Sequence, residues 1–96
     1  MFYELYNNLG STIEFPELTT LEDNAFEEGF PRTYISNIRF PKLANVTSNS
    51  LYNMMYSHST STVIHFPANM QSVISSLSQY PYFGGSSSYI SCAFDL

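Results

Sequence analysis

A short string of residues recurs along the sequence at a nearly constant spacing, and this repetition limits the folds open to the chain. Its clearest copy is Ile38-Arg39-Phe40-Pro41-Lys42-Leu43. An earlier copy is Ile13-Glu14-Phe15-Pro16-Glu17-Leu18, a later one begins Ile64-His65-Phe66-Pro67, and a weaker echo is Ile90-Ser91-Cys92. The four leading isoleucines follow one another at 25, 26 and 26 residues. Such a period is typical of a solenoid, in which each unit buries its apolar side against its neighbours.

Each copy reads as a short strand with one apolar and one polar face. Ile38 and Phe40 flank Arg39, so alternation points the two apolar side chains to one face and the arginine to the other. The proline that follows lacks a backbone N–H and ends strand pairing. Parallel stacking of the four strands would then place their middle residues in one ladder, Glu14, Arg39, His65 and Ser91. This ladder is either a solvated sheet face or a row of ligand contacts.

The segments between the strands carry apolar residues at helical spacing. In the first, Leu18, Leu21, Ala25 and Phe26 alternate with a water-facing acidic group, Glu22, Asp23, Glu27 and Glu28. In the third, a longer helix is predicted from the apolar stripe Met70, Val73, Ile74, Leu77 and Tyr80. The sequence therefore predicts an α/β fold: a short solenoid of the leucine-rich-repeat kind, with a parallel sheet on one side and short helical returns on the other.

The chain length and the repeat boundaries predict one repeat domain. Ninety-six residues make one domain at most. We expect a half-repeat helix at 1–10, where Gly10 ends the apolar pattern, followed by units at 11–34, 35–62 and 63–88 and a terminal strand at 89–96. Open ends of such an array could pair with other chains, because unpaired strand edges recruit partners.

Charge and hydropathy exclude two classes of partner. The formal net charge of −5, with three Lys and Arg residues against eight Asp and Glu, argues against binding to nucleic-acid phosphates. It also argues against an anionic membrane surface. No apolar run approaches the ~20 residues that span a bilayer, so membrane insertion is not expected, and any signal or anchor would lie outside this chain.

The sequence offers little for catalysis or metal binding. Cys92 is the single cysteine, which excludes an internal disulfide and a multi-thiolate metal site, and its apolar surroundings favour a buried, inert thiol. His58 lies in a Ser/Thr-rich loop, and His65 is not spaced from it as a metal-binding pair. We expect no cofactor, no metal and no enzymatic activity.

Aromatic residues near the end of the chain allow two interpretations. Tyr80, Tyr82, Phe83 and Tyr89 could close the end of the core, or they could offer ring faces for stacking against a sugar or a peptide. Tyr82 and Tyr89 are therefore kept as candidate binding residues beside Glu14, Arg39 and His65.

The repeated pattern resembles the BspA-type leucine-rich repeat of bacterial surface proteins. The likeness is clearest from Ile13-Glu14-Phe15-Pro16-Glu17-Leu18-Thr19-Thr20-Leu21 through Ala25-Phe26, where that family has a strand, a proline, an x-L-x-x-I step and an Ala-Phe pair. The second unit has Ser50-Leu51 in place of Ala-Phe, and the third has one residue inserted after the proline.

This resemblance implies a secreted or cell-surface protein that binds rather than catalyses. The expected function is a binding or adhesion module whose protein or glycan ligand contacts the exposed sheet face. The alternative is a structural spacer, or a self-assembling piece that forms homo-oligomers through its open ends.

Overall fold

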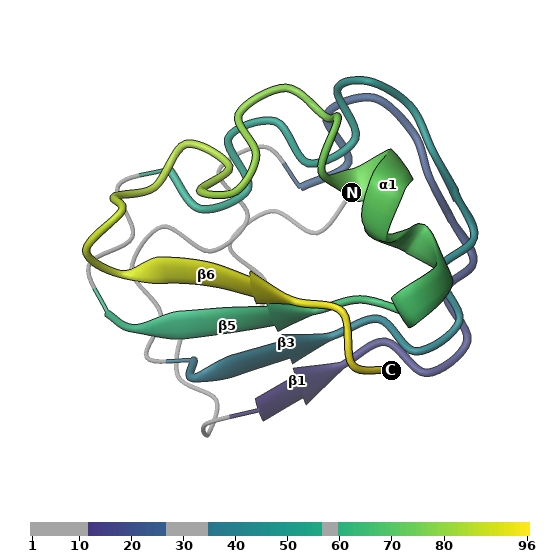
Figure 1. Cartoon of the computed structure of the whole chain (residues 1–96), viewed down its shortest axis with the longest axis horizontal. Helices are drawn as coiled ribbons and strands as arrows, with labels where there is room; N and C mark the ends of the chain where they lie inside the picture. The colour runs from purple at the N-terminus through teal and green to yellow at the C-terminus, as the bar shows by residue number, and fades with distance from the viewer. Residues whose placement is uncertain (1–11, 27–34, 57–59) are drawn as a thin grey trace.

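Four parallel strands form the main sheet of the protein, and they stand in the order in which the chain makes them. A computed structural model describes residues 12–26, 35–56 and 60–96. The strands are β1 (Thr12–Glu14), β3 (Asn37–Arg39), β5 (Thr62–His65) and β6 (Ile90–Ala93), in the order β1-β3-β5-β6 (Figure 1). The prediction of an α/β fold with a parallel sheet is confirmed. The predicted helix at 1–10 and His58 lie outside the described residues.

The first three strands pair in the register that the repeats predict. Ile13 lies opposite Ile38, and Ile38 lies opposite Ile64. Glu14, Arg39 and His65 consequently stand side by side. The strands β1 and β3 end immediately before the dipeptides Phe15-Pro16 and Phe40-Pro41, as expected from a residue that cannot donate to a ladder.

The fourth strand is shifted by two residues from the predicted register. Ile64 pairs with Cys92 rather than Ile90, and His65 pairs with Ala93, so Ser91 does not complete the ladder. The shift brings Phe94 onto Phe66, with ring centroids 5.7 Å apart and planes 24° apart. Aromatic packing therefore sets the register of β6, and the isoleucine spacing does not.

A column of stacked phenylalanine rings joins the four strands. The centroids of Phe15 and Phe40 are 5.4 Å apart and those of Phe40 and Phe66 are 5.7 Å apart, with interplanar angles of 9° and 14°. Phe94 continues this phenylalanine column. Aromatic pairs at such distances add stabilisation beyond their buried area. Buried aliphatic side chains, three methionines and two further phenylalanines fill the rest of one core: Met54, Met55, Met70, Phe26 and Phe83.

The segments that return from one strand to the next are mostly turns, which corrects the predicted helical returns. In the first two units the described part of the return holds the two-residue strands β2 (Thr20–Leu21) and β4 (Asn45–Val46), which pair in parallel. Turns follow both strands, and Glu22 and Asp23 lie there rather than on a helix. Glu27 and Glu28 lie outside the described residues.

The long helix predicted in the third unit is also much shorter than the apolar stripe suggested. A 3₁₀ turn, η1 (Ala68–Met70), leads into α1 (Gln71–Ile74), and turns follow it (Figure 1). The Ser76 hydroxyl donates to the Val73 carbonyl at 2.7 Å, a local bond that competes with helix continuation. Val73, predicted on the apolar stripe, is 44% exposed.

The phenylalanine column gives a stability prediction. Phe40 stacks on both sides and is fully buried, whereas Phe94 is partly buried. We expect Phe40→Ala to lower the free energy of unfolding by about 3–5 kcal/mol, because it removes a buried ring and leaves a cavity. Denaturant titration measures this loss, and Phe94→Ala should cost clearly less. Equal losses for the two variants would contradict the role of the column.

Candidate functional site

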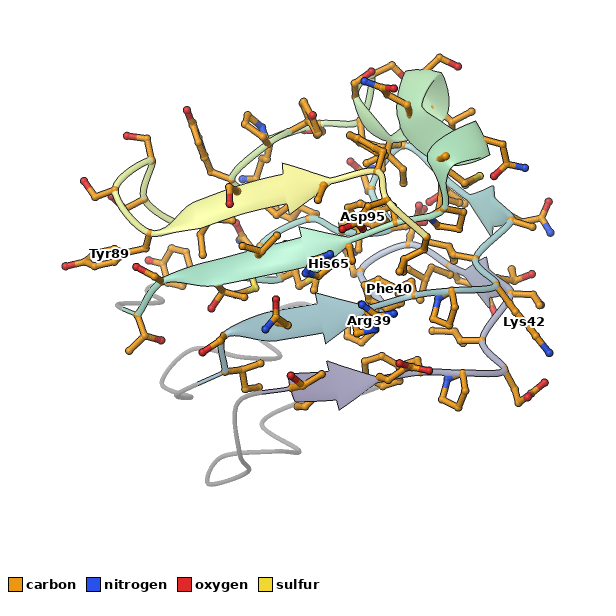
Figure 2. All side chains as sticks on the ribbon, turned by 60° about the horizontal axis from the view of Figure 1, so that its bottom comes forward. Arg39, Phe40, Lys42, His65, Tyr89 and Asp95 are labelled. Atoms are coloured by element: carbon orange, nitrogen blue, oxygen red, sulfur yellow. The ribbon has the colours of Figure 1, made fainter. Side chains whose placement is uncertain are left out.

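The exposed face of the main sheet carries a row of polar side chains from three strands and from the segment after β6. We call Glu14, Asn37, Arg39, His65 and Asp95 the polar row. Figure 2 shows Arg39, His65 and Asp95 on this face. The prediction that Glu14, Arg39 and His65 are neighbours is confirmed by the strand register.

An ion pair joins the first two members of the row. The Arg39 Nε atom donates to Oε1 of Glu14 at 3.0 Å. The two side chains are 37% and 44% exposed, so water screens the attraction and the pair contributes about 0.2–1 kcal/mol at most. The main effect of this contact is therefore to orient the Arg39 guanidinium group on the sheet face.

The His65 side chain is only 13% exposed, against 55% for Asp95, and both of its ring nitrogens have oxygen partners. Nδ1 lies 2.9 Å from Oδ1 of Asp95, and Nε2 lies 2.8 Å from Oδ1 of Asn37. A doubly protonated imidazole donates to both oxygens at once. The ring thereby joins β3, β5 and the segment after β6.

The contact with His65 changes the pKa of the Asp95 carboxyl. The hydrogen bond from His65 holds the pKa of the Asp95 carboxyl below its ordinary value, and the charges of His65 and Arg39 act in the same direction. A carboxylate that accepts such a bond is favoured in its ionised form. The row therefore carries a negative charge at each end, on Glu14 and Asp95, and the positive charge of Arg39 between them.

The arrangement of His65 bears on catalysis. A histidine oriented by a carboxylate is two-thirds of a nucleophilic triad, in which the second ring nitrogen takes the proton of a nucleophile. Here that nitrogen, Nε2, is bonded to Asn37. Cys92 lies at a neighbouring strand position, but its Sγ donates to the Pro81 carbonyl at 3.3 Å, and burial raises the pKa of its thiol to about 12. The predicted inert thiol agrees with this environment.

The other two predicted binding residues lie apart from the polar row. Tyr89 precedes β6 and stands at the opposite end of that strand from Asp95 (Figure 2). Tyr82 belongs to the turns between α1 and β6, which lie across the core from the sheet (Figure 1). Both are exposed, whereas Phe83 is buried and Tyr80 packs against the core. The structure thus divides the aromatic group between the two interpretations.

Two members of the polar row, Asn37 and Asp95, were not predicted from the sequence. Asn37 lies two residues before Arg39 and could have been found by extending the strand alternation by one step. Asp95 required the correct register of β6. The signal for that register was the Phe94 ring itself, which follows Phe66 by 28 residues, whereas Phe66 follows Phe40 by 26.

Further polar contacts tie the first unit to the second beyond the sheet. Lys42 Nζ lies 3.2 Å from Oε1 of Glu17, and the Asn45 amide lies 3.5 Å from the Thr20 hydroxyl. The Thr47 hydroxyl donates to the Asp23 carboxylate. Each contact joins residues 24 or 25 positions apart, so the links follow the repeat.

Comparisons with known proteins complete the description of the site. No protein-family model, no curated protein and no solved structure matches this chain. Within residues 12–26, 35–56 and 60–96, no three His, Cys, Asp or Glu side chains gather as a metal site. In the same part of the chain, no helix has the length and hydropathy needed to cross a bilayer.

The contact between His65 and Asp95 predicts an acid-sensitive stabilisation. A depressed pKa in the folded state means that the bond stabilises the fold above the ordinary carboxyl pKa of about 4, and that this contribution is lost as the pH falls through the lower, folded-state value. We expect His65→Ala to raise the pKa of Asp95 toward its ordinary value. A ¹³C NMR titration of the Asp95 carboxyl measures both proteins. An ordinary pKa in the unmodified protein would contradict the assignment.

Proposed function

We propose that this chain is a non-catalytic binding module whose partner contacts the polar row on the sheet face. The single observation that carries the proposal is the way the row is held. Glu14 fixes Arg39, while Asp95 and Asn37 fix His65, all on one sheet face. Side chains held before a partner arrives lose less conformational entropy on binding, which favours affinity.

The same proposal includes the finer architecture. We infer a short solenoid of the leucine-rich-repeat kind, similar to BspA-type repeats. Three features support it: parallel strands in chain order, residue partners about 25 positions apart, and a second parallel pair in the returns. The exposed sheet face is the usual binding surface of solenoids.

A cell-surface or secreted location is the compartment that we propose for this module. Its support is compositional, since 11% of residues are charged and the polar surface consists largely of Ser, Thr, Asn and Tyr. A protein or glycan displayed outside the cell is the corresponding partner.

Charge reversal at Arg39 tests the binding face. We expect Arg39→Glu to weaken adhesion of the immobilised chain to mucin- or collagen-coated surfaces at least about tenfold, because a charged hydrogen-bonding group is lost and its sign inverted. The fold should persist with a loss of about 1 kcal/mol, since the pair with Glu14 is exposed.

Lys42→Glu is the matched control for this variant. It makes the same charge change and breaks the corresponding ion pair with Glu17, but Lys42 lies in the turn after β3, away from the row (Figure 2). Adhesion should survive it. Unfolding by Arg39→Glu, or equal loss of adhesion in both variants, would refute the proposed face.

A second function, self-assembly through the sheet edges, has its own supporting observation. Parallel order gives the sheet two edges of the same polarity, one at β1 and one at β6. The bonds to β5 use the carbonyls of Tyr89 and Ala93, so the N–H and C=O groups of Cys92, which lies between them, point away from β5. Edges of this kind could pair head to tail, which produces open filaments rather than closed dimers.

Sedimentation equilibrium over a wide concentration range tests this alternative. Head-to-tail pairing should give a mean mass that keeps rising with concentration, without a plateau at a dimer. A constant monomer mass at millimolar concentration would count decisively against assembly.

A further inference from the structure

Apart from Asp95, all formally charged side chains lie in the first 42 residues. Seven of the eight acidic residues precede residue 29, and the three basic residues, Arg32, Arg39 and Lys42, follow within the next fourteen positions. Residues 43–94 contain no Asp, Glu, Lys or Arg at all. The second half of the protein therefore presents a surface of hydroxyl, amide and aromatic groups, with histidine as its only titratable cation.

The exposed aromatic side chains lie in this uncharged half. Among the described residues, the large hydrophobic side chains that are exposed are Tyr52, Tyr56, Val73, Tyr82 and Tyr89. Four of these five are tyrosines, whose rings combine an apolar face with a hydroxyl group. In the described part of the first unit no large hydrophobic side chain is exposed to this degree.

Three of the tyrosines are carried by two turns that are fastened together. We call residues 51–56 and 79–85 the tyrosine turns; they bear Tyr52, Tyr56 and Tyr82. The Asn53 backbone N–H donates to Oε1 of Gln79 at 2.8 Å, and the Gln79 amide donates back to Oδ1 of Asn53 at 3.1 Å. The Met55 N–H donates to the Phe83 carbonyl at 2.9 Å.

Close packing beneath the tyrosine turns makes them rigid. Met54, Met55 and Phe83 are fully buried under them. Gly84 has φ +87°, and a Cβ atom there would lie 2.7 Å from Oδ1 of Asn53, so the two turns touch where a side chain cannot fit. These turns lie across the core from the sheet (Figure 1), away from the polar row.

We propose that the tyrosine turns form a second binding site, for a neutral oligosaccharide. Tyrosine rings stack on the apolar faces of sugar rings, and fixed amide and hydroxyl groups bond their hydroxyls. The absence of formal charge from residues 43–94 matches an uncharged ligand, whereas a sulfated or uronic-acid glycan would find no Lys or Arg in that half of the chain. The site does not depend on the polar row or on the function proposed for it.

Titration with defined sugars tests the proposal. The chain contains no tryptophan, so its fluorescence comes from its eight tyrosines, which include the three exposed rings of this site. The neutral probes are cellohexaose, maltoheptaose and chitohexaose, and the anionic probe is hexagalacturonate. At least one neutral probe should quench the fluorescence in a saturable way. Tyr52→Ala and Tyr82→Ala should each weaken that binding about two- to tenfold, the effect of one aromatic contact.

Two control variants make the test decisive. Tyr89→Ala removes an exposed tyrosine outside the tyrosine turns, and Arg39→Glu alters the polar row; neither should change the affinity for the sugar. Thermal unfolding checks that Tyr52→Ala and Tyr82→Ala remain folded. The proposal is overturned if no neutral probe binds at millimolar concentration, if hexagalacturonate binds as well as the neutral probes, or if Tyr89→Ala weakens binding as much as Tyr52→Ala. Loss of sugar binding in Arg39→Glu would instead place the sugar on the sheet face and overturn a second site.

Discussion

The structure depends above all on the column of phenylalanine rings that runs through the four strands. Phe15, Phe40, Phe66 and Phe94 stack at centroid distances of 5.4–5.7 Å. This contact aligns the strands along their length, and it therefore also decides which side chains meet on the opposite face. The contacts of Glu14 with Arg39 and of His65 with Asp95 therefore follow from the stacking of these rings inside the core. The polar row and the core therefore depend on the same strand register.

The sequence predicted the first three strands in their correct register, because two signals agreed there, and it predicted the fourth strand in a register that is wrong by two residues. Isoleucine and phenylalanine repeat together at Ile13–Phe15, Ile38–Phe40 and Ile64–Phe66, so either one sets the register. At the fourth strand the two signals separate. Ile90 keeps the period of 26, but Phe94 stacks on Phe66 in the observed register, in which Ile90 is also buried. Asp95 reaches the candidate site through that shift.

The return segments were predicted less well for a different physical reason. Apolar residues three and four positions apart suit a helix, but they also suit a chain that turns repeatedly over a core of stacked rings. In the first two units pairing of β2 with β4 satisfies backbone groups that a helix would have satisfied internally. In the third, serine side chains bond the carbonyls of the last helical turn. Periodicity predicted most of the buried residues, with Val73 as an exception, and it could not predict which backbone conformation buries them.

The cross-unit ion pairs have a consequence for how the repeats can be arranged. In both pairs the acid belongs to the first unit and the base to the second, Glu14 with Arg39 and Glu17 with Lys42. A copy of the first unit placed against itself would set carboxylate against carboxylate at both positions, which is unfavourable. The units share a backbone plan but are not interchangeable. Their side chains are suited to particular neighbours. A repeat gained or lost by recombination would therefore keep these ion pairs in some positions of the array and place like charges together in others.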